Sequence, residues 1–370
     1  MDKFPRNQLC WCGSGIKYKY CHLGRENQLK TLPSDYLKRI DRAYSKKCCL
    51  HPNASSSACK GDIIKAHTIQ RKGGLDLIAR DGHVYSCARH NRNPFAAHDV
   101  DAVPNKVGTG QASIFTGFCA FHDNQLFTPL EKRSFEATPE QIFLLQYRSL
   151  CREYFAKIAE KSLIPEMRLL DRGSNIKAQK YIQEHLDMYE LGVDSAIEDF
   201  ERLKRNHDSL LETGDFSSLR YYIVLFDRRP DILCAATHLP EFDFTGNEIQ
   251  VIHDRSKIAS WLHFSLLASD QGGAAVFSWL GDDSICSKLI ESIDTLRNED
   301  LPQAILRYTF EFFGNVYFSP NWWDELSQDV RRDVWERQLR RFDTPREADC
   351  LIDNEVIYVN WLVTRRRKNI

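Results

Sequence analysis

The residues with the clearest chemical potential lie near the N-terminus, where four metal-ligating side chains occur within a short stretch: Cys10, Cys12, Cys21 and His22. Thiolates and imidazoles are ligands that zinc prefers, and four of them close a tetrahedral site. Gly13-Ser14-Gly15 separates the two pairs. Because glycine adopts conformations that other residues avoid, the chain can fold back there and aim both pairs at one ion. The pattern therefore predicts a zinc site.

This stretch resembles the SEC-C zinc motif, which is found at the C-terminus of the SecA translocation ATPase and is appended to many bacterial proteins. The resemblance covers about residues 5–24 and includes the hallmark positions Gly13, Ser14, Gly15, Lys17, Tyr18 and Lys19. It implies a zinc knuckle that serves as a docking piece and has no catalytic role.

A second group of possible ligands follows between residues 48 and 123. It begins with Cys48, Cys49 and Cys59, which precede an apolar, β-branched stretch around His67. A basic loop comes next, with Arg71 and Lys72 before two glycines. The group ends at a predicted helix start with Cys119, His122 and Asp123. A strand, a returning strand and a helix that share these ligands predict a ββα-metal finger.

Here the sequence resembles the HNH nucleases. The resemblance implies that His67 is the general base and that Asp123 holds a catalytic Mg²⁺ or Mn²⁺ beside it. It also implies a structural zinc, the second in the chain, on Cys49, Cys59, Cys119 and His122, with Cys48 as the alternative to Cys49. Phosphodiester hydrolysis needs such a base next to a water molecule, and a divalent ion to neutralise charge on the phosphate.

Two function classes fit these residues. The first is a metal-dependent HNH-like endonuclease, such as a bacterial defence effector. The second is a non-catalytic zinc adaptor that recognises a protein or nucleic-acid partner. Ala66 and Gln70 stand where many HNH nucleases have aspartate and proline, and no asparagine is well placed to orient His67. These differences favour the adaptor, whereas the charge distribution favours the nuclease.

Charge is distributed unevenly along the 370 residues. Lys and Arg outnumber Asp and Glu by 21 to 11 through Arg133, and they are outnumbered by 40 to 29 after it. Positive charge around a metal-binding module favours contact with a phosphate backbone. We therefore expect nucleic acid as a partner, DNA more than RNA, with contacts from Arg71 and Lys72. A solvated basic face that pairs with the acidic remainder is the alternative.

After Arg133 the patterns change. Thr138-Pro139-Glu140 predicts a helix start, and helical spacing continues to about residue 211. Strands are expected near 219–226, 231–236 and 274–279, with helices near 284–296, 301–313 and 324–341. The basic residues 364–368 are expected to form a solvated terminus.

The predicted fold class is α+β with four parts. These are a zinc knuckle (1–30), an HNH-like module (40–135), a helical spacer or dimerisation element (138–212) and an α+β C-terminal domain (215–370). The knuckle and the C-terminal domain are candidate protein-binding parts, and a homo-oligomer is compatible with the helical region. No secretory signal and no apolar run of about 18 residues is present. We therefore expect a cytoplasmic protein in which the twelve cysteines form metal sites and buried thiols.

Overall fold

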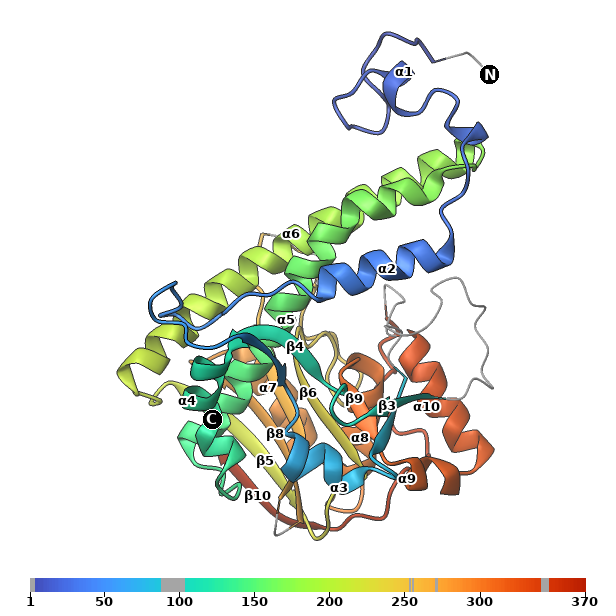
Figure 1. Cartoon of the computed structure of the whole chain (residues 1–370). Coiled ribbons are helices and arrows are strands. Elements are labelled where there is room, and N and C mark those ends of the chain that lie inside the picture. The colour runs from blue at the N-terminus through green and yellow to red at the C-terminus, as the bar shows by residue number, and fades with distance from the viewer. Residues whose placement is uncertain (1–3, 88–103, 253, 255, 270–271, 341–345) are drawn as a thin grey trace. The chain divides into compact units, whose positions relative to one another are not determined.

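The computed structural model describes residues 4–87, 104–252, 254, 256–269, 272–340 and 346–370 (Figure 1). These residues form two compact units. The first unit contains the residues up to 46 together with 154–202, and the second contains the described parts of 47–153 and all that follows 202. Two long helices, α5 (Pro139–Met167) and α6 (Ile176–Thr213), contribute residues to both units. Helices and strands both occur, so the fold is of mixed α and β type.

The first unit is helical. Its short elements are α1 (Tyr18–Cys21), η1 (Arg25–Asn27), α2 (Pro33–Tyr44) and η4 (Arg168–Asp171). The parts of α5 and α6 within this unit run side by side (Figure 1). Lys161 of α5 joins them, because its Nζ lies 2.7 Å from a carboxylate oxygen of Glu190 and 2.8 Å from one of Asp194. Arg39 pairs with Glu166, which connects α2 to α5.

The second unit is built on an eight-stranded sheet in which every pair of neighbours is antiparallel. The strand order is β10-β5-β8-β7-β6-β9-β2-β3. The strands are β2 (His83–Ser86), β3 (Asn105–Gly108), β5 (Leu219–Phe226), β6 (Ile232–His238), β7 (Leu262–Ser269), β8 (Gly272–Leu280), β9 (Val316–Phe318) and β10 (Val363–Asn369). The central strands β6 and β8 are buried along almost their whole length, because both faces of the sheet are covered.

Four helices contribute to the main core on one face of this sheet. They are α7 (Ser284–Asp294), α8 (Leu301–Phe312), α9 (Pro320–Glu325) and α10 (Gln328–Arg340). Every residue of α8 is buried. Successive strand residues point to opposite faces, so Cys234 joins this core whereas Leu233 and Ala235 belong to a separate cluster with Leu75.

The opposite face is where the metal-binding segment lies. A two-stranded hairpin pairs β1 (Ile63–His67) with β4 (Ile114–Cys119), and α4 (Ala120–Glu131) follows β4 directly. Between the two strands, η2 (Arg71–Leu75) and α3 (Asp76–Ile78) pack on the sheet, where Leu75 and Ile78 contact the cluster of Leu233.

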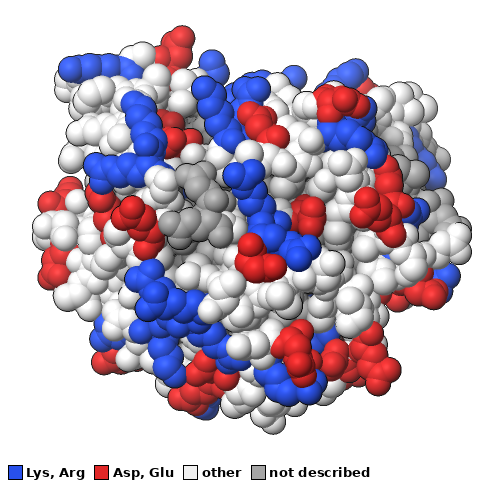
Figure 2. Space-filling view, turned by 90° about the horizontal axis from the view of Figure 1, so that it is seen from below, with Lys and Arg blue, Asp and Glu red and all other residues white. Residues whose placement is uncertain are grey.

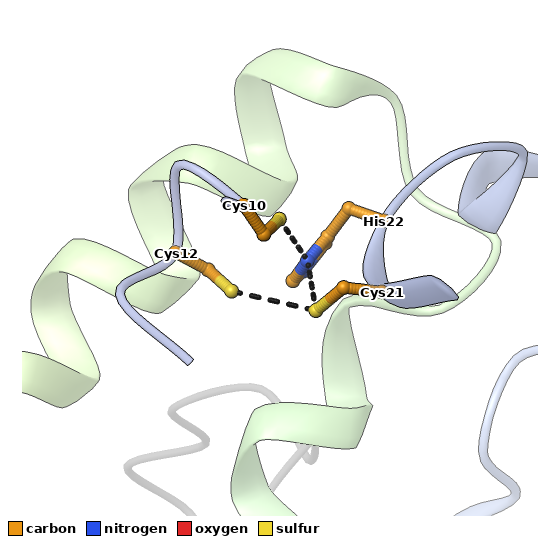
Figure 3. Close-up of side chains that lie close together, drawn as sticks. All are labelled: Cys10, Cys12, Cys21 and His22. Atoms are coloured by element: carbon orange, nitrogen blue, oxygen red, sulfur yellow. Dashed lines mark hydrogen bonds between the residues drawn. The ribbon is translucent and has the colours of Figure 1, made fainter. Parts of the chain in front are cut away.

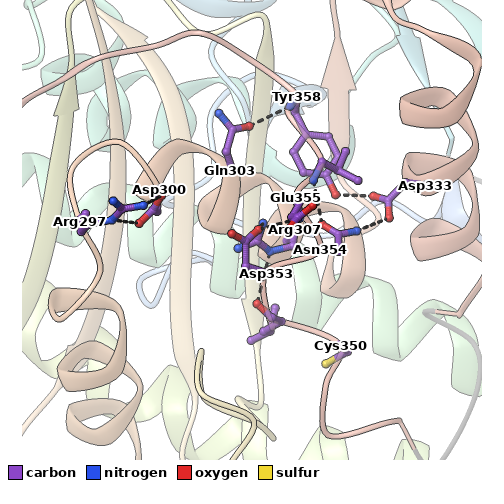
Figure 4. A network of polar contacts seen from close by, with 12 residues as sticks. Arg297, Asp300, Gln303, Arg307, Asp333, Cys350, Asp353, Asn354, Glu355 and Tyr358 are labelled. Atoms are coloured by element: carbon purple, nitrogen blue, oxygen red, sulfur yellow. Dashed lines mark hydrogen bonds and ion pairs between the residues drawn. The ribbon is translucent and has the colours of Figure 1, made fainter.

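Residues 350–361 are held to α8 by side chains that bond to their backbone. Gln303 Oε1 accepts from the Tyr358 amide at 2.8 Å, and Gln303 Nε2 donates to the Val359 carbonyl at 2.7 Å (Figure 4). Arg307 donates to Asp353 Oδ1 at 2.7 Å. These bonds fix the chain just before β10. The basic residues 364–368 belong to the edge strand β10, which pairs with β5, and Thr364, Arg365 and Lys368 are exposed to solvent.

The division into units differs from the expected one. β2 and β3 come from the segment 40–135, yet they extend the sheet formed by the strands that follow residue 215. The expected helical region 138–212 is shared between the two units. Pairing between distant strands causes this difference, because composition along the chain does not specify which strands become neighbours.

Candidate metal centres

The first cluster brings Cys10, Cys12, Cys21 and His22 together in the first unit (Figure 3). One ligand atom from each residue lies within 4.8 Å of all the others. His22 Nδ1 is 3.3 Å from Cys10 Sγ and 3.1 Å from Cys21 Sγ, and Cys12 Sγ is 3.5 Å from Cys21 Sγ. Zn–S bonds of about 2.3 Å and Zn–N bonds of about 2.0 Å place tetrahedral ligands roughly 3.5–3.8 Å apart. The donor set and its spacing therefore fit zinc.

The local backbone explains how the two halves of the first cluster meet. The Cys10 amide donates to the Ile16 carbonyl at 2.7 Å, which closes the loop. Gly13 and Gly15 have φ angles of 72° and 70°, in the left-handed region that glycine enters without steric cost. Cys21 then ends α1, and His22 follows it directly.

A buried carboxylate orients His22. Its Nε2 lies 2.9 Å from Asp171 Oδ2, at the end of η4, and Asp171 is fully buried. Asp171 also accepts from Arg25 Nε at 2.5 Å and from Gln183 Nε2 at 2.8 Å. Burial opposes ionisation of Asp171, but the bonds from His22, Gln183 and Arg25 outweigh it, so the pKa of Asp171 is lowered. A carboxylate at this position fixes the tautomer and orientation of a metal-binding histidine.

The second cluster consists of Cys49, Cys59, Cys119 and His122, in the second unit. Their ligand atoms also lie within 4.8 Å of one another. His122 Nδ1 is 3.4 Å from Cys49 Sγ, 3.7 Å from Cys59 Sγ and 3.3 Å from Cys119 Sγ. Cys49 takes part in this cluster and Cys48 does not. These donors again fit zinc in type, number and spacing.

The hairpin and the start of α4 position these four residues. Cys119 is the N-cap of α4, and its sulfur accepts from the His122 amide. The Phe121 amide donates to the Lys60 carbonyl, which brings the neighbouring Cys59 to the helix start. The Leu50 amide donates to the Gly117 carbonyl and holds the segment of Cys49 beside β4. Backbone pairing thus places all four ligands.

The cysteines of the two clusters differ in acidity, because the effect of burial is outweighed by hydrogen bonds that lower the pKa of Cys12 and of Cys119. Burial raises the pKa of Cys10 to about 12 and that of Cys49 to about 11. Zinc binds the thiolate, so its binding displaces these protons and couples metal affinity to pH. With four protein ligands, each centre would hold the ion in a closed coordination shell, which is typical of structural zinc.

His67 lies at the end of β1 and is half-buried. Its Nε2 is 3.1 Å from the Thr109 carbonyl oxygen. Burial lowers the pKa of His67, and the nearby Arg71 and Arg148 lower it further against the opposing effects of Thr109 and Glu131. The imidazole is therefore neutral at pH 7. Because Nε2 must carry the proton to bond a carbonyl, Nδ1 is left as the basic nitrogen.

Asp123 lies in the first turn of α4, and burial raises the pKa of its carboxyl group. The structure describes both His67 and Asp123, and no hydrogen bond or ion pair joins them. Among the residues that the structure describes, the two Cys₃His sets are the metal-binding clusters of three or more ligands, and neither includes His67 or Asp123. The catalytic role expected for His67 and Asp123 therefore stays a prediction.

The expected phosphate contacts lie on η2. Arg71 has a half-exposed side chain whose Nε is 3.6 Å from Asp76 Oδ1, and Lys72 is exposed. The face drawn in Figure 2, the chain seen from below, shows Lys and Arg intermingled with Asp and Glu. A continuous basic surface does not cover that face.

The positions of several residues near the metal centres could not be predicted from the sequence. Asp171 is 149 positions from His22, and no motif connects the two. The ring of His51 stacks on the ring of His122, with 4.1 Å between the ring centres and 4° between the planes. Arg148 and Glu131, which influence His67, form an ion pair at 2.8 Å. Each of these relationships depends on contacts between distant segments.

Comparison with known proteins gives one match to a protein family. Residues 6–24 match the SEC-C motif. The segment is similar to the protein translocase subunit SecA of two Chloroflexus aurantiacus strains, J-10-fl and Y-400-fl, with 67% identity over 27 residues in each case. That similarity covers 7% of this chain and 3% of SecA. No solved structure matches the chain.

The match supports the expected zinc-binding motif at the N-terminus. It leaves residues 25–370 outside the family model. Among the described helices, none is long and apolar enough to cross a membrane.

Proposed function

We propose that this chain is a zinc-dependent adaptor that binds nucleic acid and has two structural metal centres. The observation that supports this best is the closed ligand set of each cluster. Catalytic zinc sites keep a coordination position open for water or substrate, whereas four protein ligands leave none. Each ion would stabilise one part of the fold. The first would hold the SEC-C knuckle in the first unit, and the second would hold the hairpin and α4 in the second unit.

Nucleic acid is the proposed partner because of the basic N-terminal third and the exposed cations of η2. Arg71 and Lys72 precede the paired glycines Gly73 and Gly74, so little side-chain bulk follows them. A cation that contacts phosphate releases counterions, and binding then weakens steeply as salt rises. The similarity to a SecA segment is compatible with a second, protein-docking role for the knuckle.

A fluorescence-anisotropy titration tests this function. The zinc-loaded chain should bind labelled duplex DNA more tightly than RNA of the same sequence, and affinity should fall at least about tenfold between 50 and 200 mM KCl. Replacing Arg71 and Lys72 together by Ala should reduce the slope of log affinity against log salt by about two. Lys288→Ala, at an exposed lysine of α7, is the matched control and should leave the slope unchanged. Absent or salt-independent binding would contradict the adaptor's nucleic-acid role.

HNH-like hydrolysis of nucleic acid is the second candidate function. It is favoured by His67, a neutral imidazole oriented by a backbone carbonyl on the hairpin that leads into α4. Such a group has the properties of a general base. The same preparations therefore need incubation with Mg²⁺ and with Mn²⁺. One outcome is that the wild type cleaves nucleic acid while His67→Ala does not, with zinc content and nucleic-acid affinity retained. That result would show that the chain is a nuclease and not a non-catalytic adaptor.

A further inference from the structure

The second unit contains a cavity that the two metal centres do not use. Its volume is about 350 Å³, which lies within the range of small-molecule sites. The floor comes from the sheet, through Leu233 and Ala235 of β6 and Ser265 and Leu267 of β7. The walls come from the start of η2 and from the segment that leads from α4 to α5.

The charge of the lining favours an anion. Four cations line the cavity, Lys72, Lys132, Arg133 and Arg148, against one carboxylate, Glu131. Glu131 is already paired with Arg148, and Arg133 lies 3.7 Å from Glu140 outside the cavity. Lys72 and Lys132 are exposed and make no ion pair with any described residue. Two mobile ammonium groups therefore stand at the cavity without partners.

Two deeply buried side chains of the lining have polar atoms with no hydrogen-bond partner. Thr68 is 2% exposed and Arg148 is 3% exposed, and neither Thr68 Oγ1 nor Arg148 Nε has a partner. Leaving a buried donor unsatisfied is costly, so such groups often mark a place where another molecule binds. Arg148 is held firmly, with its guanidinium 4.1 Å from the centre of the Phe127 ring.

We propose that this cavity binds a mononucleotide, with its base over the apolar floor and its phosphate at Lys72 and Lys132. Leu233 and Leu267 offer apolar contact to a flat ring, whereas Gln70 and Ser265 offer polar groups to its edge. A fatty acid would match the cations and the floor but would leave these polar groups unpaired. Inorganic phosphate would leave the floor uncovered. This site is independent of the metal centres. It shares Lys72 with the proposed nucleic-acid contacts, whereas Lys132 belongs to the cavity alone.

Calorimetric titration of the zinc-loaded full chain with AMP, GMP, CMP and UMP tests the proposal. At least one nucleotide should bind with a dissociation constant on the order of 10–100 µM, as ligand efficiency suggests for roughly 23 non-hydrogen atoms. The matching nucleoside and inorganic phosphate should each bind at least about tenfold more weakly, because each lacks one half of the ligand.

The variant Lys72→Glu with Lys132→Glu should weaken nucleotide binding at least about tenfold. Both positions are exposed, so the exchange leaves the core packing unchanged. Lys288→Glu lies on α7 outside the cavity and should bind normally. No binding of any nucleotide at 5 mM, or equal binding by the charge-reversed variant, would overturn the proposal. Nucleoside binding as tight as nucleotide binding would also overturn it. If a hexanucleotide binds and no mononucleotide does, the proposal is overturned, and the cavity would instead bind the end of a nucleic-acid strand.

Discussion

His22 and Asp171 connect the first metal centre to the helices of its unit, although 149 positions separate them in the sequence. The His22 ring directs Nδ1 toward the cysteines and Nε2 toward Asp171 Oδ2 at 2.9 Å. Since Asp171 is fully buried and also bonds Arg25 and Gln183, the imidazole has one orientation. The carboxylate should therefore strengthen zinc binding without being a ligand.

Asp171→Asn should weaken zinc binding at the first centre about 10–100-fold, which is typical for loss of such a partner. The amide keeps the shape of the side chain but loses the charge that favours a His22 proton on Nε2. Competition with a chromophoric chelator measures this affinity directly. Asp187→Asn is the control, because Asp187 is a half-exposed partner of Arg168 on α6. Equal zinc affinity in the wild type and in Asp171→Asn would show that the carboxylate does not support the metal.

Arg337→Met should lower the free energy of unfolding by about 3 kcal/mol, the low end for breaking a buried ion pair, because buried Glu311 would keep only Arg340 as its partner. Arg337 lies 3.1 Å from Glu311, and the two side chains are only 4% and 1% exposed. Arg337 also donates to the Cys350 carbonyl at 2.6 Å. Denaturant unfolding followed by tryptophan fluorescence gives the value.

Arg332→Met is the matched control for Arg337→Met, since it lies on the same helix with a half-exposed side chain paired to Asp329. Exposed pairs contribute little, so its cost should stay below about 1 kcal/mol. Similar costs for both variants would contradict a stabilising buried pair at Arg337.

Stability should fall as pH decreases from about 6.5 to 4, in part because of His207. This residue is fully buried, and burial lowers its pKa to about 4. Its Nδ1 donates to the Leu203 carbonyl at 2.7 Å, and its Nε2 accepts from Gln146 at 2.7 Å. Below pH 6.5 the unfolded chain binds a proton that the folded chain does not. The folded state therefore loses up to about 1.4 kcal/mol per pH unit through this group.

The variant His207→Gln isolates this contribution, because glutamine is not protonated. The slope of unfolding free energy against pH between 4 and 6.5 should be shallower in the variant, whereas the two slopes should agree above pH 7. Parallel slopes across the range would mean that His207 is not a buried neutral histidine. Zinc content must be measured at each pH, because acid also releases metal from thiolates.

Local patterns in the sequence were sufficient for several elements. α5 begins at Pro139 with the Gln141 amide 3.2 Å from Thr138 Oγ1, as the helix-start pattern predicts. α7 and α8 lie within the ranges expected for helices. The ligands of the first centre were also suggested by local spacing, because Cys10, Cys12, Cys21 and His22 lie within thirteen residues. These features depend on neighbours within a few residues.

Features that depend on distant contacts were not predictable in the same way. Asp81 and Gly82 form the turn that leads into His83, but nothing near them shows that β2 joins β9 through Tyr85 and Phe318. The basic residues of β10 pair with β5, whose strand lies about 140 positions earlier in the sequence. Composition alone favoured solvent for them. The position of Asp171 beside His22 likewise follows from tertiary packing.

The most direct test of two structural zinc centres is the zinc content of the purified chain and its cysteine variants by elemental analysis. We expect two zinc ions per wild-type chain, one in Cys12→Ser, one in Cys59→Ser and none in the double variant. Cys87→Ser should retain two, because Cys87 is buried outside both clusters. A wild-type content near one that Cys59→Ser leaves unchanged would contradict the second centre and the account built on it.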